Sequence, residues 1–233
     1  MGIVTILPET TPDPISLIGR RAGICWGADT TDPERNYKRG LDCITSGHGR
    51  TLEYVNCEAV LSKWSARVIR EWYTHIAGGP TRLQESTRYI DYTKDFQYVT
   101  PPSIKNAGED AIRIYDNAIA HIVKSAKAIE EMGVPREDAA LLYPLAMNTR
   151  IVDKRNLRSL MDMSRQRMCN RAYHEYRVLF HTYINALSNY SQEWKTLIPL
   201  LMMPKCEAVG YCTEKKSCGR MPRNTNRKDK ISE

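Results

Sequence analysis

The sequence NAGEDAIRIYDNAIAHIVKSAKAIEEM, residues 106–132, carries the clearest periodic pattern in the chain. Apolar side chains recur along it at spacings of three and four: Ile112, Tyr115, Ile119, Ile122, Ala126 and Ile129. That spacing puts them on one side of an α-helix. Gly133 and Pro135 follow, and both residue types end helices. We therefore expect one long helix here, within a helix-rich fold.

The segments that follow this helix predict a turn and then a second long helical region. Pro144 favours a short helix end or turn within LLYPLAMNTRI, residues 141–151. Residues 154–187 contain neither proline nor glycine, so a helical region is expected along their whole length.

The segments before it mix short strands and helices. GIVTIL at residues 2–7 predicts a short strand, and EYVNCEAVLS at residues 53–62 could form another. Helices are expected around SLIGRRAGICW, from Pro33 to Ser46 behind the capping residue Asp32, and in SARVIREWYTHI, residues 65–76. Residues 77–92 break the periodicity with Gly-Gly-Pro and predict a polar loop. The sum is an α+β fold rich in helix.

Length and composition set broad limits. The 233 residues, 42% of them hydrophobic, are enough for one globular domain with a real core. We expect a domain at 1–203, a cysteine-containing extension at 204–222 and a mobile polar tail at 223–233. The start of the chain predicts neither a signal peptide nor a membrane span, and seven scattered cysteines favour a reducing compartment, so a cytoplasmic protein is expected. The net charge of +7 favours anionic partners of any kind.

Polar side chains crowd the loop TRLQESTRYIDY, residues 81–92, directly after the Gly-Gly-Pro turn. They are Arg82, Gln84, Glu85, Ser86, Arg88 and Tyr89. Arginine offers forked donors to phosphate, serine a hydroxyl donor, and glutamine an amide that can pair with a base edge. The loop suits a nucleotide; the alternative is an ordinary solvated turn.

Six arginines occupy RNLRSLMDMSRQRMCNRAYHEYR, residues 155–177. On a continuous helix, Arg167, Arg171 and Glu175 would form one line at spacings of four. The arginines could bind an anion; the alternative is an exposed face with Glu175–Arg171 ion pairs.

The loop residues Glu85-Ser86-Thr87-Arg88-Tyr89, together with Asn156-Leu157-Arg158-Ser159-Leu160, resemble the flavin-dependent thymidylate synthase family. That family has a signature that begins Arg-His-Arg and ends in a spaced Ser, Asn, Ser and Arg. Ser86 and Arg88 match its last two places and Thr81 stands at the earlier serine. The start departs from it: aligned on the preceding helix, Thr74, His75 and Ile76 keep only the histidine.

Other departures concern single positions. Leu83 stands at the signature asparagine, Tyr54 at a usual histidine, Ala140 at a frequent nucleotide-binding arginine, and Arg171 at a common histidine. Arg82 is an additional cation that could replace a lost one.

The resemblance implies a small, mainly antiparallel sheet in a helix-rich α+β domain, and a homotetramer. It implies reductive methylation of dUMP to dTMP with FAD, NADPH and methylenetetrahydrofolate. Substrate binding would fall to Gln84, Glu85, Ser86, Arg88 and Arg167, and flavin binding to His75, Thr81, Asn156, Arg158 and Asp162. Arg167 and Ser86 are the catalytic candidates: Arg167 would stabilise negative charge on the pyrimidine, and Ser86, which lacks an activating base, would act through binding.

Three alternatives stay open. The substrate could be another pyrimidine nucleotide such as UMP, because Ala140 and the missing arginines change the anion-binding set. A non-catalytic nucleic-acid-binding protein is the second, although aromatic residues are not interleaved with the arginines and no nucleic acid or membrane partner is expected. The third is a zinc site at Cys206, Cys212 and Cys218, whereas the default expectation is that these cysteines are reduced thiols that bind no metal.

Overall fold

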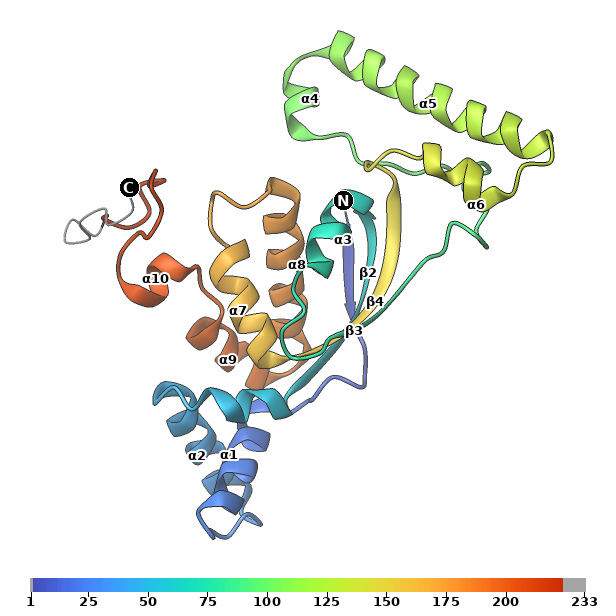
Figure 1. Ribbon diagram of the computed structural model, residues 1–233. Coiled ribbons are helices and arrows are strands. Elements are labelled where there is room, and N and C mark those ends of the chain that lie inside the picture. Colours follow the sequence, from blue (N-terminus) through green and yellow to red (C-terminus); the bar gives the residue numbers. More distant parts are fainter. Residues whose placement is uncertain (1, 224–233) are drawn as a thin grey trace, which may run out of the picture. The chain divides into compact units, whose positions relative to one another are not determined.

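The computed structural model describes residues 2–223 and has the helix-rich α+β fold that the sequence predicts (Figure 1). Most of the tail predicted to be mobile, residues 224–233, lies outside the described residues. In the described part, no helix combines the length and apolar character needed to cross a membrane.

The sheet is small and antiparallel, with four strands in the order β1-β2-β4-β3. Their bounds are β1 Ile3–Ile6, β2 Asn56–Ser65, β3 Thr81–Gln84 and β4 Asn148–Asn156. In the first part of β2 every second residue is buried, namely Cys57, Ala59 and Leu61. This period of two is the property that lets one face of a strand pack on a core while the other faces outward.

Contacts divide the chain into two compact units, and β2 and β4 contribute to both. The first unit comprises residues up to Ile3, Val60–Thr74 and Arg82–Asp153. Its helices are α3 Ala66–Tyr73, α4 Pro102–Asn106, α5 Glu109–Glu131 and α6 Arg136–Ala139, followed by the 3-10 turn η2 Ala140–Leu142. The predicted long helix is α5, which begins three residues later than expected because Gly108 (φ 103°) separates it from α4.

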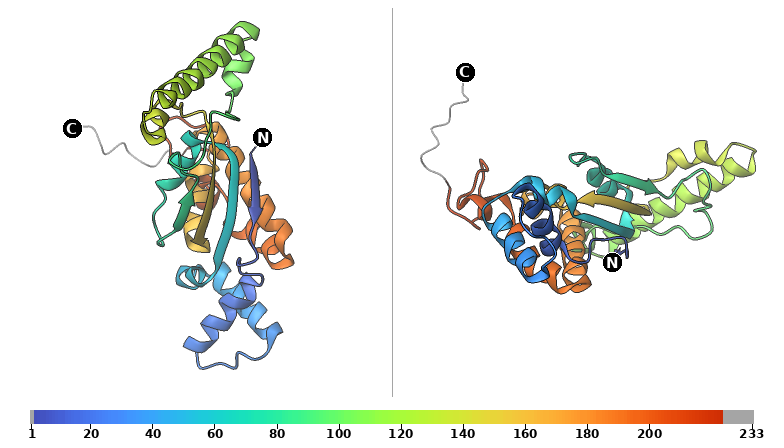
Figure 2. Two further views of the ribbon diagram at one scale, coloured as in Figure 1. Left: turned by 90° about the vertical axis from the view of Figure 1, so that its right-hand side faces the viewer. Right: turned by 90° about the horizontal axis from the view of Figure 1, so that it is seen from below.

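The second unit comprises Val4–Ala59, His75–Thr81 and the chain from Lys154 on. Its elements are α1 Pro14–Cys25, α2 Pro33–Thr45, the 3-10 helix η1 Gly49–Tyr54, α7 Leu157–Arg167, α8 His174–Tyr190, α9 Gln192–Leu201 and α10 Lys205–Val209. Figures 1 and 2 show α1 and α2 side by side. They can approach closely because Gly19 has no Cβ, which would lie 1.8 Å from the carbonyl oxygen of Asn36. Trp194, Tyr183 and Phe180 are fully buried in α8 and α9.

The prediction of one helical region over residues 154–187 is wrong. Strand β4 continues to Asn156, α7 ends at Arg167, and α8 starts only at His174. Asn156 explains the start of α7: its side-chain oxygen accepts a hydrogen bond of 2.9 Å from the Ser159 amide, as an N-cap residue does. Because the helix is interrupted after Arg167, the expected line of Arg167, Arg171 and Glu175 does not exist.

Two segments predicted as turn or loop contain strands instead. Asn148–Ile151, placed in a turn because of Pro144, begins β4, and Thr81–Gln84, placed in a polar loop, forms β3. β3 is an edge strand in the sheet order, so its side chains can stay polar and exposed. At both places hydrogen bonding to a distant strand determines the structure, whereas the local composition indicated a turn or a loop.

Candidate functional site

In the second unit, Arg167 is held by two aromatic side chains. Its Nε donates a hydrogen bond of 2.8 Å to His75 Nε2, and its guanidinium carbon lies 4.4 Å from the centre of the Tyr176 ring. The His75 and Tyr176 rings also meet edge to face at 6.1 Å. Arg167 ends α7, His75 follows α3, and Tyr176 lies in the first turns of α8, so three segments fix one guanidinium.

The environment of His75 keeps its ring neutral. Burial, then the positive charges of Arg167 and the fully buried Arg155, lower the pKa of His75 to about 4. A neutral ring leaves Nε2 without a proton, as the hydrogen bond from Arg167 requires, so Nδ1 carries the proton. His75 therefore adds no charge beside the guanidinium.

The start of α7 lies against the backbone of the Gly-Gly-Pro turn. Gly78 has φ 80°, and a Cβ there would come within 2.7 Å of Asn156 Nδ2. Only glycine gives both that backbone conformation and that closeness. Asn156 thus uses its oxygen to cap α7, and its amide nitrogen faces the bare backbone of the turn.

The other residues proposed for flavin binding differ in how firmly they are held. Arg158 Nη1 lies 2.7 Å from Glu53 Oε1, and both side chains are 47% exposed. Asp162 is half-buried and has no side-chain partner among the described residues, while Thr81 is exposed at the start of β3. The second unit thus holds His75, Thr81, Asn156, Arg158, Asp162 and Arg167.

In the first unit, the end of β3 and the residues after it form ion pairs and hydrogen bonds with β4 and α6. Gln84 Nε2 donates to Thr149 Oγ1 at 3.1 Å, and Glu85 forms an ion pair with Arg150 at 2.7 Å. Arg88 forms an ion pair with Glu137. This segment is therefore not a freely solvated turn.

Ser86 shapes the local backbone. Its Oγ accepts a hydrogen bond of 3.2 Å from the Arg88 amide, and its carbonyl oxygen accepts from the amides of Tyr89 and Ile90. No base lies within hydrogen-bonding distance of Oγ in the described part of the chain, which agrees with a binding role rather than a nucleophilic one.

Two further side chains complete the first unit's polar surroundings. Arg82 donates to the Tyr73 carbonyl oxygen at 2.9 Å and lies 4.5 Å from the centre of the Tyr73 ring. Burial, followed by the nearby Glu85, raises the pKa of Tyr92 to about 12, so its hydroxyl stays protonated and can donate.

Several contacts could not be read from the sequence. Glu53 and Glu137 lie far along the chain from Arg158 and Arg88, which they contact, and no spacing rule joins them. Tyr176 is closer to Arg167 in sequence, but it lies in a separate helix, beyond the break that the sequence did not indicate. The Glu175–Arg171 ion pairs, expected under the alternative of an exposed face, do not form. Glu175 is buried, and Arg171 forms an ion pair with Glu214 at 3.3 Å. In the described residues no group of three or more His, Cys, Asp or Glu side chains is placed to hold a metal ion, and all seven cysteines are thiols.

Comparisons with known proteins agree on one family. The family model described as thymidylate synthase complementing protein matches residues 6–190. A flavin-dependent thymidylate synthase of Clostridium tetani is 27% identical over 94% of this chain and 94% of its own length. Proteins of the same name from Geobacter sulfurreducens and Thermococcus onnurineus are 29% and 30% identical, covering 74% and 72% of this chain and 77% and 69% of their own lengths.

Proposed function

The chain belongs to the thymidylate synthase complementing protein family, and from this membership we propose that it converts dUMP to dTMP by reductive methylation. The relatives named flavin-dependent thymidylate synthase support the reaction class. The observation that carries the proposal within the molecule is the Arg167 guanidinium, held in place by His75 and Tyr176.

Three cofactors complete the proposed reaction. When bound, methylenetetrahydrofolate supplies the one-carbon unit, FAD supplies the hydride that completes the methyl group, and NADPH supplies the electrons that reduce the flavin. The chain's own contribution is then to bind, to orient and to stabilise charge.

The residues near the start of α7 fit a flavin. A Cβ at Gly79 would meet nothing within 4 Å, so a flat ring system could approach the turn there, while the Asn156 amide lies against the neighbouring Gly78. Neutral His75 can donate from Nδ1 without adding charge. Arg158 could bind a phosphate by exchanging Glu53 for it, because that ion pair is half exposed. Thr81 and Asp162 would add polar contacts.

Arg167 is proposed to stabilise negative charge as it develops on the pyrimidine. A guanidinium already fixed by a hydrogen bond and a ring contact needs little reorganisation during the reaction, which is the property that makes such groups effective. Because His75 is neutral, it holds Arg167 without competing for the charge of the substrate.

The segment Gln84–Arg88 is proposed to bind the nucleotide. Gln84 would pair with the base edge, and Ser86 and Arg88 would donate to the phosphate. Arg88 must release Glu137 to do so, and Glu85 stays bound to Arg150 as a rigid support. A homotetramer located in the cytoplasm is part of the same proposal.

The first experiment is an absorbance spectrum of the purified protein. We expect bound flavin that loses its colour on addition of NADPH and turnover of dUMP to dTMP with methylenetetrahydrofolate. Protein that binds no FAD, even after incubation with excess cofactor, would refute the proposal.

A comparison of dUMP with UMP tests the substrate. Ala140 is buried and replaces the arginine that often binds nucleotide in this family, so UMP is the second candidate. Higher kcat/KM for dUMP supports the proposal, whereas higher kcat/KM for UMP would assign the chain to a C5-methylase of the ribonucleotide.

A further inference from the structure

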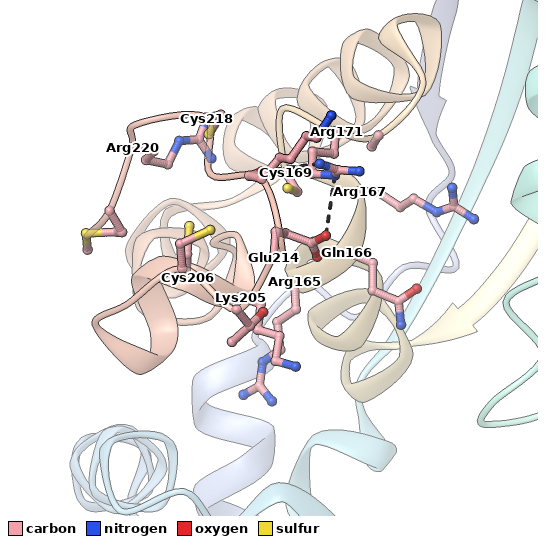
Figure 3. Close-up of a pocket in the computed structure, with 15 residues that line it drawn as sticks. Arg165, Gln166, Arg167, Cys169, Arg171, Lys205, Cys206, Glu214, Cys218 and Arg220 are labelled. Atoms are coloured by element: carbon pink, nitrogen blue, oxygen red, sulfur yellow. Dashed lines mark hydrogen bonds and ion pairs between the residues drawn. The ribbon is translucent and has the colours of Figure 1, made fainter. Parts of the chain in front are cut away.

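A cavity of about 500 Å³ lies in the second unit, between the end of α7, helix α10 and the segment that follows α10 (Figure 3). Its volume is in the range of small-molecule sites. The match to the family model covers residues 6–190, so α10 and the following segment lie beyond it. One wall of this cavity is therefore formed by residues outside that match.

The cavity is strongly basic. The lining residues include one carboxylate, Glu214, and six basic residues, of which Arg167 directs its guanidinium elsewhere: Arg165, Arg167, Arg171, Lys205, Lys216 and Arg220. Like charges gathered around one pocket repel one another, and an anion bound among them relieves that repulsion.

Three of these cations have no ion-pair partner in the described part of the chain: Arg165, Lys205 and Lys216. Arg165 makes only a weak contact of 3.8 Å with the sulfur of Met161. Their charges are available to a ligand without breaking an existing contact.

Glu214 occupies part of the basic surface. Its carboxylate lies 3.3 Å from Arg171 Nε, as the dashed line in Figure 3 shows. Arg171 also donates to the Lys216 carbonyl oxygen at 3.2 Å, and Arg220 donates to the Met168 carbonyl oxygen at 3.0 Å. The arginines thus fix the cavity wall, and an incoming anion must compete with Glu214 at Arg171 and with Glu207 at Arg220.

This cavity is separate from the Arg167 cluster described above. Figure 3 shows the Arg167 side chain directed away from Cys206 and Arg220, in agreement with its contacts to His75 and Tyr176. The aliphatic part of the Arg167 side chain therefore lines the cavity, while its guanidinium contacts His75 and Tyr176.

We infer that this cavity binds a phosphate-bearing small molecule with several negative charges, up to the size of a nucleotide. Arginine and lysine donors around one pocket suit phosphate oxygens, which accept several charge-assisted hydrogen bonds at once. Single-stranded nucleic acid also needs aromatic side chains on which its bases stack, and no aromatic side chain lines this pocket in the described part of the chain. The inference does not depend on the proposed reaction.

The direct test is calorimetric titration of the purified protein with inorganic tripolyphosphate at physiological ionic strength. The double variant Lys205→Gln/Lys216→Gln should bind about tenfold more weakly or worse, since each loses a charged donor. The matched control is Lys195→Gln/Lys215→Gln, which removes the same charge from exposed lysines outside the cavity lining. It should change affinity less than about twofold.

A variant that should strengthen tripolyphosphate binding provides a second test. Glu214→Gln removes the competing carboxylate and should tighten tripolyphosphate binding several-fold. Citrate, a polyanion without phosphate, should bind much more weakly than tripolyphosphate.

An independent readout uses two exposed cysteines, Cys218 in the cavity lining and Cys25 outside it. The backbone amide of Arg220 lowers the pKa of Cys218, which favours its reactive thiolate. Saturating tripolyphosphate should slow alkylation of Cys218 by iodoacetamide, a neutral reagent, and leave Cys25 unchanged.

Three results would overturn the inference. They are no saturable binding of tripolyphosphate, equal losses in the two double-lysine variants, or equal affinity for citrate. The first would show that the cavity takes up no polyphosphate, the second that the attraction comes from the net charge of the protein, and the third that the cavity does not prefer phosphate.

Discussion

Arg167 is held in a fixed position. Two of its contacts are with a neutral imidazole and a phenol ring. Neither of these two contacts adds a charge next to the guanidinium. A donor fixed in this way needs little reorganisation to stabilise negative charge on a substrate.

Replacement of Arg167 by alanine should reduce kcat by about two to three orders of magnitude, the usual cost of losing a preorganised donor. The free energy of unfolding should fall by only about 1–2 kcal/mol, from the lost hydrogen bond and ring contact. Steady-state kinetics and urea unfolding measure the two effects. Lys195→Ala, at an exposed site on α9, serves as the control, and full activity of Arg167→Ala would contradict the assigned role.

The pKa of His75 predicts an acid-sensitive contribution to stability. The folded protein holds this pKa near 4, below the ordinary value of 6.5, so protons bind the unfolded chain first. The contribution of His75 to the free energy of unfolding is complete above pH 6.5 and is lost as the pH falls towards 4. It amounts to no more than about 3 kcal/mol, and less because the side chain is only partly buried.

His75→Gln tests this, because glutamine keeps an acceptor near the Nε2 position and does not titrate in this range. Unfolding free energies measured from pH 7 to pH 4 should fall more steeply for the native protein than for the variant. Identical pH profiles would show that His75 ionises normally in the folded state.

At the scale of elements, the junction of β4 and α7 serves both stability and the proposed flavin site. Asn156→Ala removes the cap of α7 and should cost about 1 kcal/mol of unfolding free energy. Asn156→Asp keeps the cap and removes the amide donor, so stability should be preserved while FAD affinity falls. Urea unfolding and flavin titration separate the two roles.

A second helix cap is the control. Ser191 caps α9 by accepting from the Trp194 amide at 3.3 Å, so Ser191→Ala should cost a similar amount of stability without changing FAD affinity. Unaltered FAD binding in Asn156→Asp would remove Asn156 from the flavin site.

Local patterns predicted the elements whose signals lie within a few residues. The proline, acid and capping aspartate at residues 32–34 gave α2 within one residue, and the apolar spacing gave α5. They failed where distant pairing decides: β3 is polar, and β4 begins inside a segment that proline made look like a turn. The helix break after Arg167 has no glycine or proline to announce it.

The candidate site was only partly predictable for the same reason. Residue chemistry and resemblance singled out Arg167, His75 and Asn156, and the structure brings Arg167 and His75 into contact. The carboxylates that pair with Arg158 and Arg88 could not be found from spacing, since such contacts depend on the tertiary fold. Whether the residues act as assigned stays a prediction.

At the scale of the whole molecule, the burial of the cysteines predicts an order of reactivity. Cys25 and Cys218 are exposed, whereas Cys43 and Cys57 are buried, and burial also raises the pKa of Cys43. Iodoacetamide should therefore modify the first two in the native protein and the last two only on unfolding. Mass spectrometry of a time course measures the order, and early modification of Cys57 would contradict the burial described here.

The two units are defined by contacts, and the boundary between them passes through all four strands of the sheet. The predicted boundaries of 1–203, 204–222 and 223–233 stay a prediction.

Strand β4 passes into α7 without a connecting residue: Asn156 ends one and Leu157 begins the other. The direction in which each α7 side chain points is therefore fixed by the alternation of side chains along β4. Successive helical residues are about 100° apart, so one amino acid inserted at this junction would turn Arg158, Asp162 and Arg167 together by that angle. Evolution can change what these side chains are, but a single insertion or deletion here would re-aim all of them at once.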